Sequence, residues 1–236
     1  MNVNALSFAI KRKLSALLTG KSPVPKTCQI DNLRQIYRSV GLHDSSGFFI
    51  EIGAFDGERF SNTSFLADQG WVGLYVEPVK ASVKKIRRRH ALNKVKILNA
   101  AVTETKGTAT IREMGVLSTT TPESLESVSW AQKAFQNSTT YQVPSVTFFD
   151  ILNHFNAKNN VDLLVIDVEG SEKTIVQQLR QSPIRPTVVV VELIDNHMDF
   201  DEIQKSNHLY TRQMIINMGY QSIYQDHINT IFWMPH

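Results

Sequence analysis

The sequence has little of what marks a secreted or membrane-spanning protein. Only Cys28 among its 236 residues is a cysteine, so a disulfide within the chain is excluded and a reducing compartment is expected. No apolar run approaches the length of a membrane-spanning helix. The start does not resemble a signal peptide, because the basic residues 11–13 follow the apolar stretch 5–10 instead of preceding it. We therefore expect a cytoplasmic protein.

Two motifs of dinucleotide-dependent enzymes are also missing. The chain contains no G-x-G-x-x-G run, which would cradle a pyrophosphate at a helix N-terminus, and no Tyr-x-x-x-Lys. The formal net charge of +3 is modest, which argues against a nucleic-acid binder. The cations nevertheless gather in two clusters: Lys11, Arg12, Lys13, Lys21 and Lys26, and Lys84, Lys85, Arg87, Arg88 and Arg89. Each cluster can contact an anionic surface or lie on a solvated helix face.

We predict a helical N-terminal extension over residues 1–45 and a main domain over residues 46–236. Leucine and isoleucine recur at helical spacing in the first segment, with basic residues between them: Leu6, Ile10, Leu14, Leu17 and Leu18. This amphipathic helix over 4–18 can pack on its own domain, on a second copy in a homodimer, or on a membrane surface. Pro23 and Pro25 then mark a linker before a second expected helix.

Apolar runs alternate with helical patterns through the main domain. Strands are expected at 48–52, 72–76, 95–98, 108–112, 143–148, 162–168 and 187–193, and helices at 62–69, 79–91, 150–155 and 171–181. The alternation predicts an α/β fold with an open, mostly parallel sheet, helices on both faces, and an antiparallel hairpin at 221–234. The Ser/Thr-rich segment 115–140 has no clear period and is expected to be a lid or mobile loop.

Carboxylates recur where the predicted strands end. Ligands of such sheets bind beyond the carboxyl ends of the strands, and the residues there are Glu51 and Gly53, Glu77, Asn99, Asp167 and Glu169, and Glu192. Each adjoins a strongly apolar segment. A buried carboxylate is costly unless it is paired, hydrogen-bonded or holding a ligand. The pattern therefore predicts a ligand site at this edge of the sheet.

The first turn and the end of the second strand favour a nucleoside site. Gly53 lets the chain leave its strand sharply, Gly57 allows close approach, and Glu51 or Asp56 can accept a hydrogen bond from an ammonium group. Glu77 follows Gly57 by about 20 residues, where a carboxylate can hold both ribose hydroxyls. Asn99 and Ala100 can form the adenine side. Each feature has an alternative explanation. The glycine turn can be an ordinary strand-to-helix turn, Glu77 can be a surface carboxylate, and the small Ala100 can serve tight packing.

Asp167 and Glu169 form a second acidic element. Two carboxylates two residues apart on an extended segment point the same way, so they converge on one region beyond the sheet edge. The pair can position an acceptor hydroxyl, take its proton, or hold a divalent cation. The alternative is that Glu169 caps the next helix and Asp167 anchors a loop. For a metal, Asp167 and Glu192 are the candidate ligands, with Asp195 nearby, and oxygen ligands favour Mg²⁺ or Ca²⁺.

The motifs together resemble the FkbM-type methyltransferases. The resemblance runs from about Phe48 to Leu193 through F-F-I-E-I-G-A-F-D-G, S-N-T, G-W-V-G-L-Y-V-E-P, N-A-A-V and L-L-V-I-D-V-E-G. It implies a class I methyltransferase (Rossmann-like) fold, S-adenosylmethionine as cofactor, and O-methylation of a sugar, glycan or other hydroxylated metabolite. The cofactor-binding residues are then expected among Glu51, Gly53, Ala54, Asp56, Gly57, Asn62, Glu77, Pro78, Asn99, Ala100 and Asp167.

The expected chemistry is an in-line transfer of the sulfonium methyl group to an acceptor oxygen. Asp167 is the first candidate for the acceptor side, Glu169 and Glu192 support it, and His197 is a second candidate base. An NAD-dependent oxidoreductase is the rival enzyme class, since Glu77 also suits the ribose of that dinucleotide. A non-catalytic nucleoside-binding module with the same fold is the rival outside enzymes.

Overall fold

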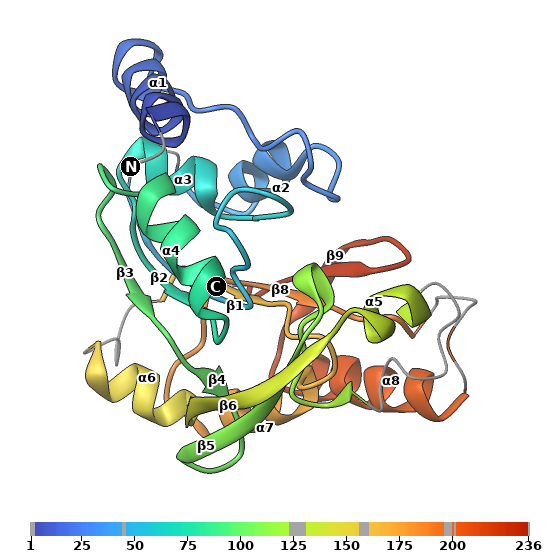
Figure 1. Ribbon diagram of the computed structural model, residues 1–236. Coiled ribbons are helices and arrows are strands. Elements are labelled where there is room, and N and C mark those ends of the chain that lie inside the picture. Colours follow the sequence, from blue (N-terminus) through green and yellow to red (C-terminus); the bar gives the residue numbers. More distant parts are fainter. Residues whose placement is uncertain are drawn as a thin grey trace.

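The fold is built on a seven-stranded sheet. The computed structural model describes residues 3–43, 46–122, 131–155, 161–195, 200 and 202–235. The strands stand in the order β3-β2-β1-β7-β8-β10-β9 (Figure 1). Their bounds are β1 Phe48–Ile52, β2 Val72–Val76, β3 Val95–Leu98, β7 Leu163–Ile166, β8 Val188–Glu192, β9 Gln221–Gln225 and β10 Asn229–Trp233. The first five are parallel, and β10 is antiparallel to both β8 and β9. The predicted parallel sheet with a terminal hairpin is confirmed.

Helices cover both faces of this sheet, as the alternation predicts. Their bounds are α1 Val3–Thr19, α2 Leu33–Ser39, α3 Ser64–Gln69, α4 Lys80–Arg89, α6 Phe148–His154, α7 Glu172–Gln181 and α8 Glu202–Asn217. Successive strand residues face opposite sides, so Phe49 packs with α2, α3 and α4, whereas Ile50 packs with α6, α7 and α8. All residues of β7 and all residues of β8 except the terminal Glu192 are buried, which explains their continuous apolar runs.

A small second sheet lies beside the carboxyl ends of the main strands. It has the order β4-β6-β5, with bounds β4 Ala101–Val102, β5 Gly107–Glu113 and β6 Thr139–Val146. The short 3₁₀ helix η1 Gly115–Leu117 and the helix α5 Gln132–Gln136 lie between β5 and β6 in the chain. The expectation of an irregular segment over 115–140 is thus wrong for η1, α5 and the start of β6, while 123–130 lie outside the described residues.

Two expected strands end earlier than predicted, and one helix was not predicted. The strand expected over 143–148 ends at Val146, because the Thr147 hydroxyl accepts from the Asp150 amide and the Asp150 carboxylate accepts from the Thr147 amide, which starts α6 at Phe148. The strand expected over 162–168 ends at Ile166, so Asp167 and Glu169 do not lie on an extended segment. Helix α8 has no expected counterpart, because exposed Ile203, Leu209 and Ile216 blur its apolar face.

Helix α1 forms an outer layer against α3 and α4 (Figure 1). Arg12 pairs with Glu58, and Arg89 of α4 pairs with both Glu58 and the buried Asp68. The Lys13 ammonium donates to the Asp68 carbonyl oxygen at 3.0 Å. Charged groups therefore tie α1 to the body of the protein. None of the helices in the described part of the chain is long and apolar enough to cross a membrane.

Gly53 is required where β1 meets the end of β7. Its φ is +89°, and a Cβ atom built there would lie 1.5 Å from the Asp167 carbonyl oxygen. The Gly53 amide donates to the Val76 carbonyl, and the Asp167 amide donates to the Ile52 carbonyl, so three strand ends are tied together at this point. Only glycine allows this approach of two backbones.

We predict that Gly53→Ala lowers the free energy of unfolding by about 3 kcal/mol or more, because strained backbone and overlap with Asp167 add together. Gly41→Ala is the matched control, since Gly41 has a φ of +84° but nothing within 4 Å of the added Cβ atom. That variant should lose only about 1 to 2 kcal/mol in denaturant unfolding. Equal losses in the two variants would contradict the role given to the close approach.

Candidate active site

One cavity of about 540 Å³ opens at the carboxyl ends of β1, β2, β7 and β8. Its size lies in the range of small-molecule sites. It brings together most of the residues predicted from the sequence: Glu51, Gly53, Ala54, Glu77, Pro78, Ala100, Asp167, Glu169 and Glu192. The lining does not include Asp56, Gly57, Asn62 or Asn99. His197, the predicted second base, lies outside the described residues.

Glu51 is buried at the end of β1 and holds the segment before α3. Its carboxylate accepts hydrogen bonds from the hydroxyls of Ser61, at 3.0 Å, and of Thr63. Ser61 in turn accepts from the amides of Thr63 and Ser64 at the start of α3. Burial raises the pKa of Glu51 to about 7, against the lowering effect of these hydrogen bonds. Glu51 thus lines the cavity and also organises its wall.

The predicted residues outside the lining shape the turns around it. Asp56 accepts from the amides of Glu58 and Arg59 and pairs with the Arg59 side chain. The Gly57 carbonyl lies 2.8 Å from a ring nitrogen of His90. The Asn99 amide group donates to the carbonyls of Glu77 and Pro78, at 2.9 and 2.8 Å.

Asn62 is buried, and its backbone carbonyl oxygen accepts from the Tyr37 hydroxyl at 3.3 Å. Asn62 and Asn99 therefore contribute hydrogen bonds to the structure around the cavity without lining it.

Glu77 is held at the end of β2 by two backbone amides. One carboxylate oxygen accepts from Phe55 at 2.9 Å, and the other accepts from Val79 at 2.8 Å. Only 5% of the side chain is exposed, and burial raises the pKa of Glu77 to about 7. The first bond fixes Glu77 against the β1 turn, so the glycine turn and this carboxylate form one wall of the cavity.

The carboxylates of Asp167, Glu169 and Glu192 meet at the other wall. Each offers an oxygen within 4.8 Å of the others. Burial raises the pKa of all three, and mutual repulsion raises those of Glu169 and Glu192 further. The hydrogen bond between the two carboxyl groups lowers the pKa of Asp167 and raises that of Glu192. The convergence predicted from the sequence is present, and Asp195 is outside it because it pairs with Arg212 at 2.7 Å.

A left-handed backbone, not an extended one, brings Glu169 to this cluster. Glu169 has a φ of +58°, and its carbonyl accepts from the Thr119 hydroxyl at 2.6 Å. The Glu172 carboxylate, at the start of α7, accepts from the Val168 and Gly170 amides. Burial raises the pKa of Glu172 to about 7. Glu169 thus does not cap α7: the N-cap residue Ser171 makes no side-chain cap hydrogen bond, and it is Glu172 that binds the backbone amides of the preceding loop.

His208 completes this wall and was missed because α8 was missed. It lines the cavity, and burial lowers its pKa to about 4, so the ring is neutral near pH 7. Its Nδ1 atom is buried with no hydrogen-bond partner among the residues that the structure describes. Thr120 and residues 115–118 of the Ser/Thr-rich segment also line the cavity. The described start of the predicted lid segment therefore contributes to the site.

Comparisons with known proteins relate this chain to one family and to several solved structures. The family model of the methyltransferase FkbM domain matches residues 51–222, well over half of the chain. The chain belongs to the FkbM methyltransferase family. Its matched region spans the glycine turn, Glu77 and the acidic cluster, so the resemblance seen in the motifs is confirmed. No curated protein matches this methyltransferase by sequence.

Solved structures share its fold at low sequence identity. A cofactor-bound protein from MTB, Rv0187, has a TM-score of 0.53 and 14% identity, covering 99% of this chain and 90% of its own. A putative caffeoyl-CoA O-methyltransferase from Staphylococcus aureus has a TM-score of 0.51 and 13% identity, covering 96% and 92%. An O-methyltransferase from Bacillus cereus in complex with SAH has a TM-score of 0.50 and 10% identity, covering 99% and 92%. The expected class I methyltransferase fold is confirmed.

Burial of Glu51 predicts a pH-dependent stability. Its pKa is about 7 in the folded protein and 4.5 when exposed, so the folded state binds the proton more tightly. The free energy of unfolding should therefore fall as the pH rises from about 4.5 through about 7. Glu51→Gln should remove on the order of 3 kcal/mol of this fall in denaturant unfolding, whereas exposed Glu104→Gln should not. An unchanged pH slope in Glu51→Gln would contradict the buried titration.

Proposed function

We propose that this methyltransferase transfers the methyl group of S-adenosylmethionine to a hydroxyl oxygen of a sugar, glycan or other hydroxylated metabolite. One observation carries the proposal. A single cavity is lined by Glu77, a carboxylate placed to bind ribose hydroxyls beside the glycine turn, and by a separate cluster of carboxylates around Asp167. The first wall suits a nucleoside, and the second suits the activation of a hydroxyl group.

The charge of the lining supports this cofactor over a dinucleotide. Carboxylates outnumber the two cationic side chains of the lining, Arg59 and Lys173. The carboxylates are Glu51, Glu77, Asp167, Glu169, Glu172 and Glu192. S-adenosylmethionine presents a sulfonium and an ammonium, which such a lining attracts, whereas it repels the pyrophosphate of NAD. The complex of the B. cereus neighbour with SAH supports the same choice on the shared fold. In this proposal Gly53 and Ala54 face the methionine end of the cofactor, and Ala100 and Pro78 face its adenine ring.

The acceptor step is an in-line displacement. The acceptor oxygen forms a bond to the methyl carbon, the carbon–sulfur bond breaks, its electron pair stays on sulfur as the thioether, and the hydroxyl proton passes to Asp167. The Asp167 carboxylate is the base because its raised pKa makes it more basic than an exposed aspartate. Glu192 keeps its proton and orients Asp167, and Glu169 borders the same space. Alignment of oxygen, methyl and sulfur supplies much of the remaining acceleration.

A divalent cation is the alternative activator. Three carboxylate oxygens within 4.8 Å match the hard ligands that Mg²⁺ takes, and a cation would lower the repulsion among them. Asp167 and Glu192 would then hold the ion with Glu169, and the ion would polarise the acceptor hydroxyl. The two activators differ in their response to chelation.

Glu77→Gln should weaken binding of S-adenosylhomocysteine about 10- to 100-fold in calorimetry, because a charged partner of the ribose hydroxyls is lost. Glu104→Gln, an exposed substitution outside the cavity, is the control for the change of charge. The thermal midpoint of each variant checks that the Phe55 turn remains folded. Undiminished affinity of Glu77→Gln would remove the ribose role. Binding of NADH by the wild type, without binding of S-adenosylhomocysteine, would favour an oxidoreductase instead.

Asp167→Asn should keep the affinity for S-adenosylhomocysteine and lose about 100-fold or more in methyl transfer. Transfer is measured from radiolabelled S-adenosylmethionine to a panel of free sugars, glycosides and polyols, with nitrogen and sulfur acceptors alongside. If Asp167 is the base, wild-type transfer survives exhaustive chelation. If a metal activates the acceptor, chelation abolishes transfer and Mg²⁺ restores it. Normal transfer by Asp167→Asn rejects both, and transfer only to nitrogen or sulfur rejects O-methylation.

A further inference from the structure

Helix α1 does not pack on the protein through its large apolar residues, as most amphipathic helices do, but exposes them to solvent. The side towards the protein presents the small, buried Ala9 and Ala16 and the charged Arg12 and Lys13. The opposite side carries large apolar residues whose exposure rises along the helix: Ile10 at 40%, Leu14 at 50%, Leu17 at 71% and Leu18 at 84%. These four residues form the outer apolar face of α1.

The contacts of α1 explain this orientation. The helix packs only on α3 and α4 among the elements with substantial contacts in the described structure. Arg12 pairs with Glu58, which Arg89 also contacts, and Lys13 reaches the Asp68 carbonyl. Because the inner side is fixed by charged groups, the helix cannot turn its leucines inward without breaking them. The ion pairs and hydrogen bonds of the inner side therefore hold the outer apolar face towards solvent.

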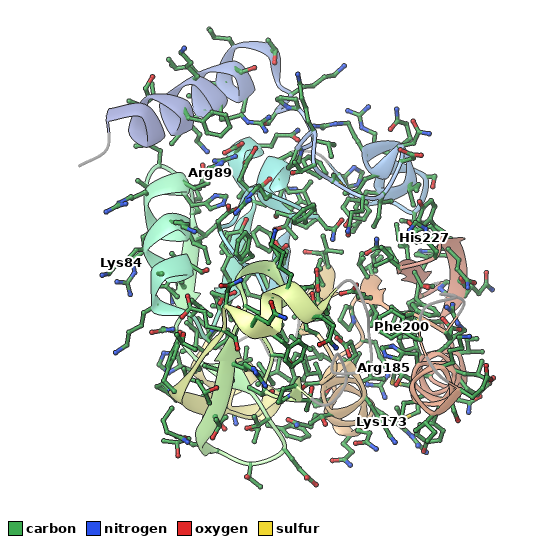
Figure 2. All side chains as sticks on the ribbon, turned by 45° about the vertical axis from the view of Figure 1, so that its right-hand side comes forward. Lys84, Arg89, Lys173, Arg185, Phe200 and His227 are labelled. Atoms are coloured by element: carbon green, nitrogen blue, oxygen red, sulfur yellow. The ribbon has the colours of Figure 1, made fainter. Side chains whose placement is uncertain are left out.

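The surroundings of the outer apolar face are basic. Residues 1–43 contain seven lysines and arginines and a single acidic residue, Asp31. Lys11 and Lys21 are exposed beside the leucines. The neighbouring α4 has no acidic residue and exposes Lys80, Lys84, Arg87 and Arg88. Figure 2 shows Lys84 on the outer side of α4, whereas Arg89 points to α1.

We propose that α1 docks this methyltransferase on a membrane surface rich in anionic lipids. Leucines insert among the acyl chains while lysines and arginines contact the headgroups, as in interfacial amphipathic helices. The helix spans 17 residues, about 25 Å, and lies along the surface instead of crossing the bilayer. This role is independent of the acceptor in the proposed function.

The charge distribution distinguishes this partner from two others. A second copy packed face to face on α1 would bring Lys11 and Lys21 towards their own equivalents, with no acidic residue in either helix to pair with them. A nucleic acid would satisfy the cations but leave Leu17 and Leu18 in water. An anionic lipid surface satisfies both the leucines and the cations.

Vesicle flotation of the full chain tests the proposal. Binding is compared on phosphatidylcholine vesicles and on phosphatidylcholine vesicles containing phosphatidylglycerol. Wild type should bind the anionic vesicles more tightly, and added salt should weaken that binding. Leu14→Ser/Leu17→Ser should weaken it about 100-fold, since each buried leucine contributes about tenfold or more. Lys84→Glu/Arg88→Glu should reduce both the affinity and the preference for anionic vesicles.

Ile203→Ser is the matched control, because Ile203 is 76% exposed on α8, away from α1, and its loss should leave vesicle binding unchanged. Thermal midpoint and S-adenosylhomocysteine affinity should be the same in wild type and the leucine variant, which shows that folding is intact. Unchanged flotation of the leucine variant, or equal binding to neutral vesicles, overturns the proposal. The proposal is also overturned if the protein does not bind vesicles and instead forms a dimer, measured by light scattering, that is lost in the Leu14→Ser/Leu17→Ser variant.

Discussion

The active-site end of the sheet is organised by the need of buried carboxylates for hydrogen-bond donors. Three segments there each bind one such carboxylate. The segment before α3 is held by Glu51 through Ser61 and Thr63. The β1 turn is held by Glu77 through the Phe55 amide, and the start of α7 by Glu172. An unpaired carboxylate in such a place would cost several kcal/mol, so these donors are part of the fold and of the site at once.

This arrangement has an electrostatic consequence for ligands. Burial opposes ionisation, so the pKa values of Glu51, Glu77 and Glu172 rise to about 7 and those of the Asp167 cluster also rise. A cationic ligand that enters the cavity favours the ionised forms, and its binding is therefore coupled to proton release. A ligand with an additional anionic group faces the opposite effect. The same carboxylates that shape the loops thus select for a ligand that carries positive charge.

The sequence predicts the sheet well because its signals are local. The β-branched runs of β7 and β8, Gly53 at the first turn and Glu77 at the end of β2 all lie where their positions in the chain indicate. The convergence of Asp167 and Glu169 was predicted for an incomplete reason, since it depends on the left-handed Glu169 held by Thr119. That contact joins residues 50 positions apart, and no local pattern specifies it. His208 was missed for a different reason, because α8 lacks a clean apolar stripe.

Helix α1 shows where periodicity stops being informative. The spacing of Leu14, Leu17 and Leu18 predicts an amphipathic helix but does not say which side meets the protein. That choice depends on Glu58, Asp68 and Arg89, which only the folded structure brings to α1. Burying an exposed leucine contributes about 1.5 to 3 kcal/mol, so a partner that covers the outer face is bound with a favourable hydrophobic free energy. An interior ion-pair network that holds leucines in water therefore indicates a helix arranged for an external apolar phase.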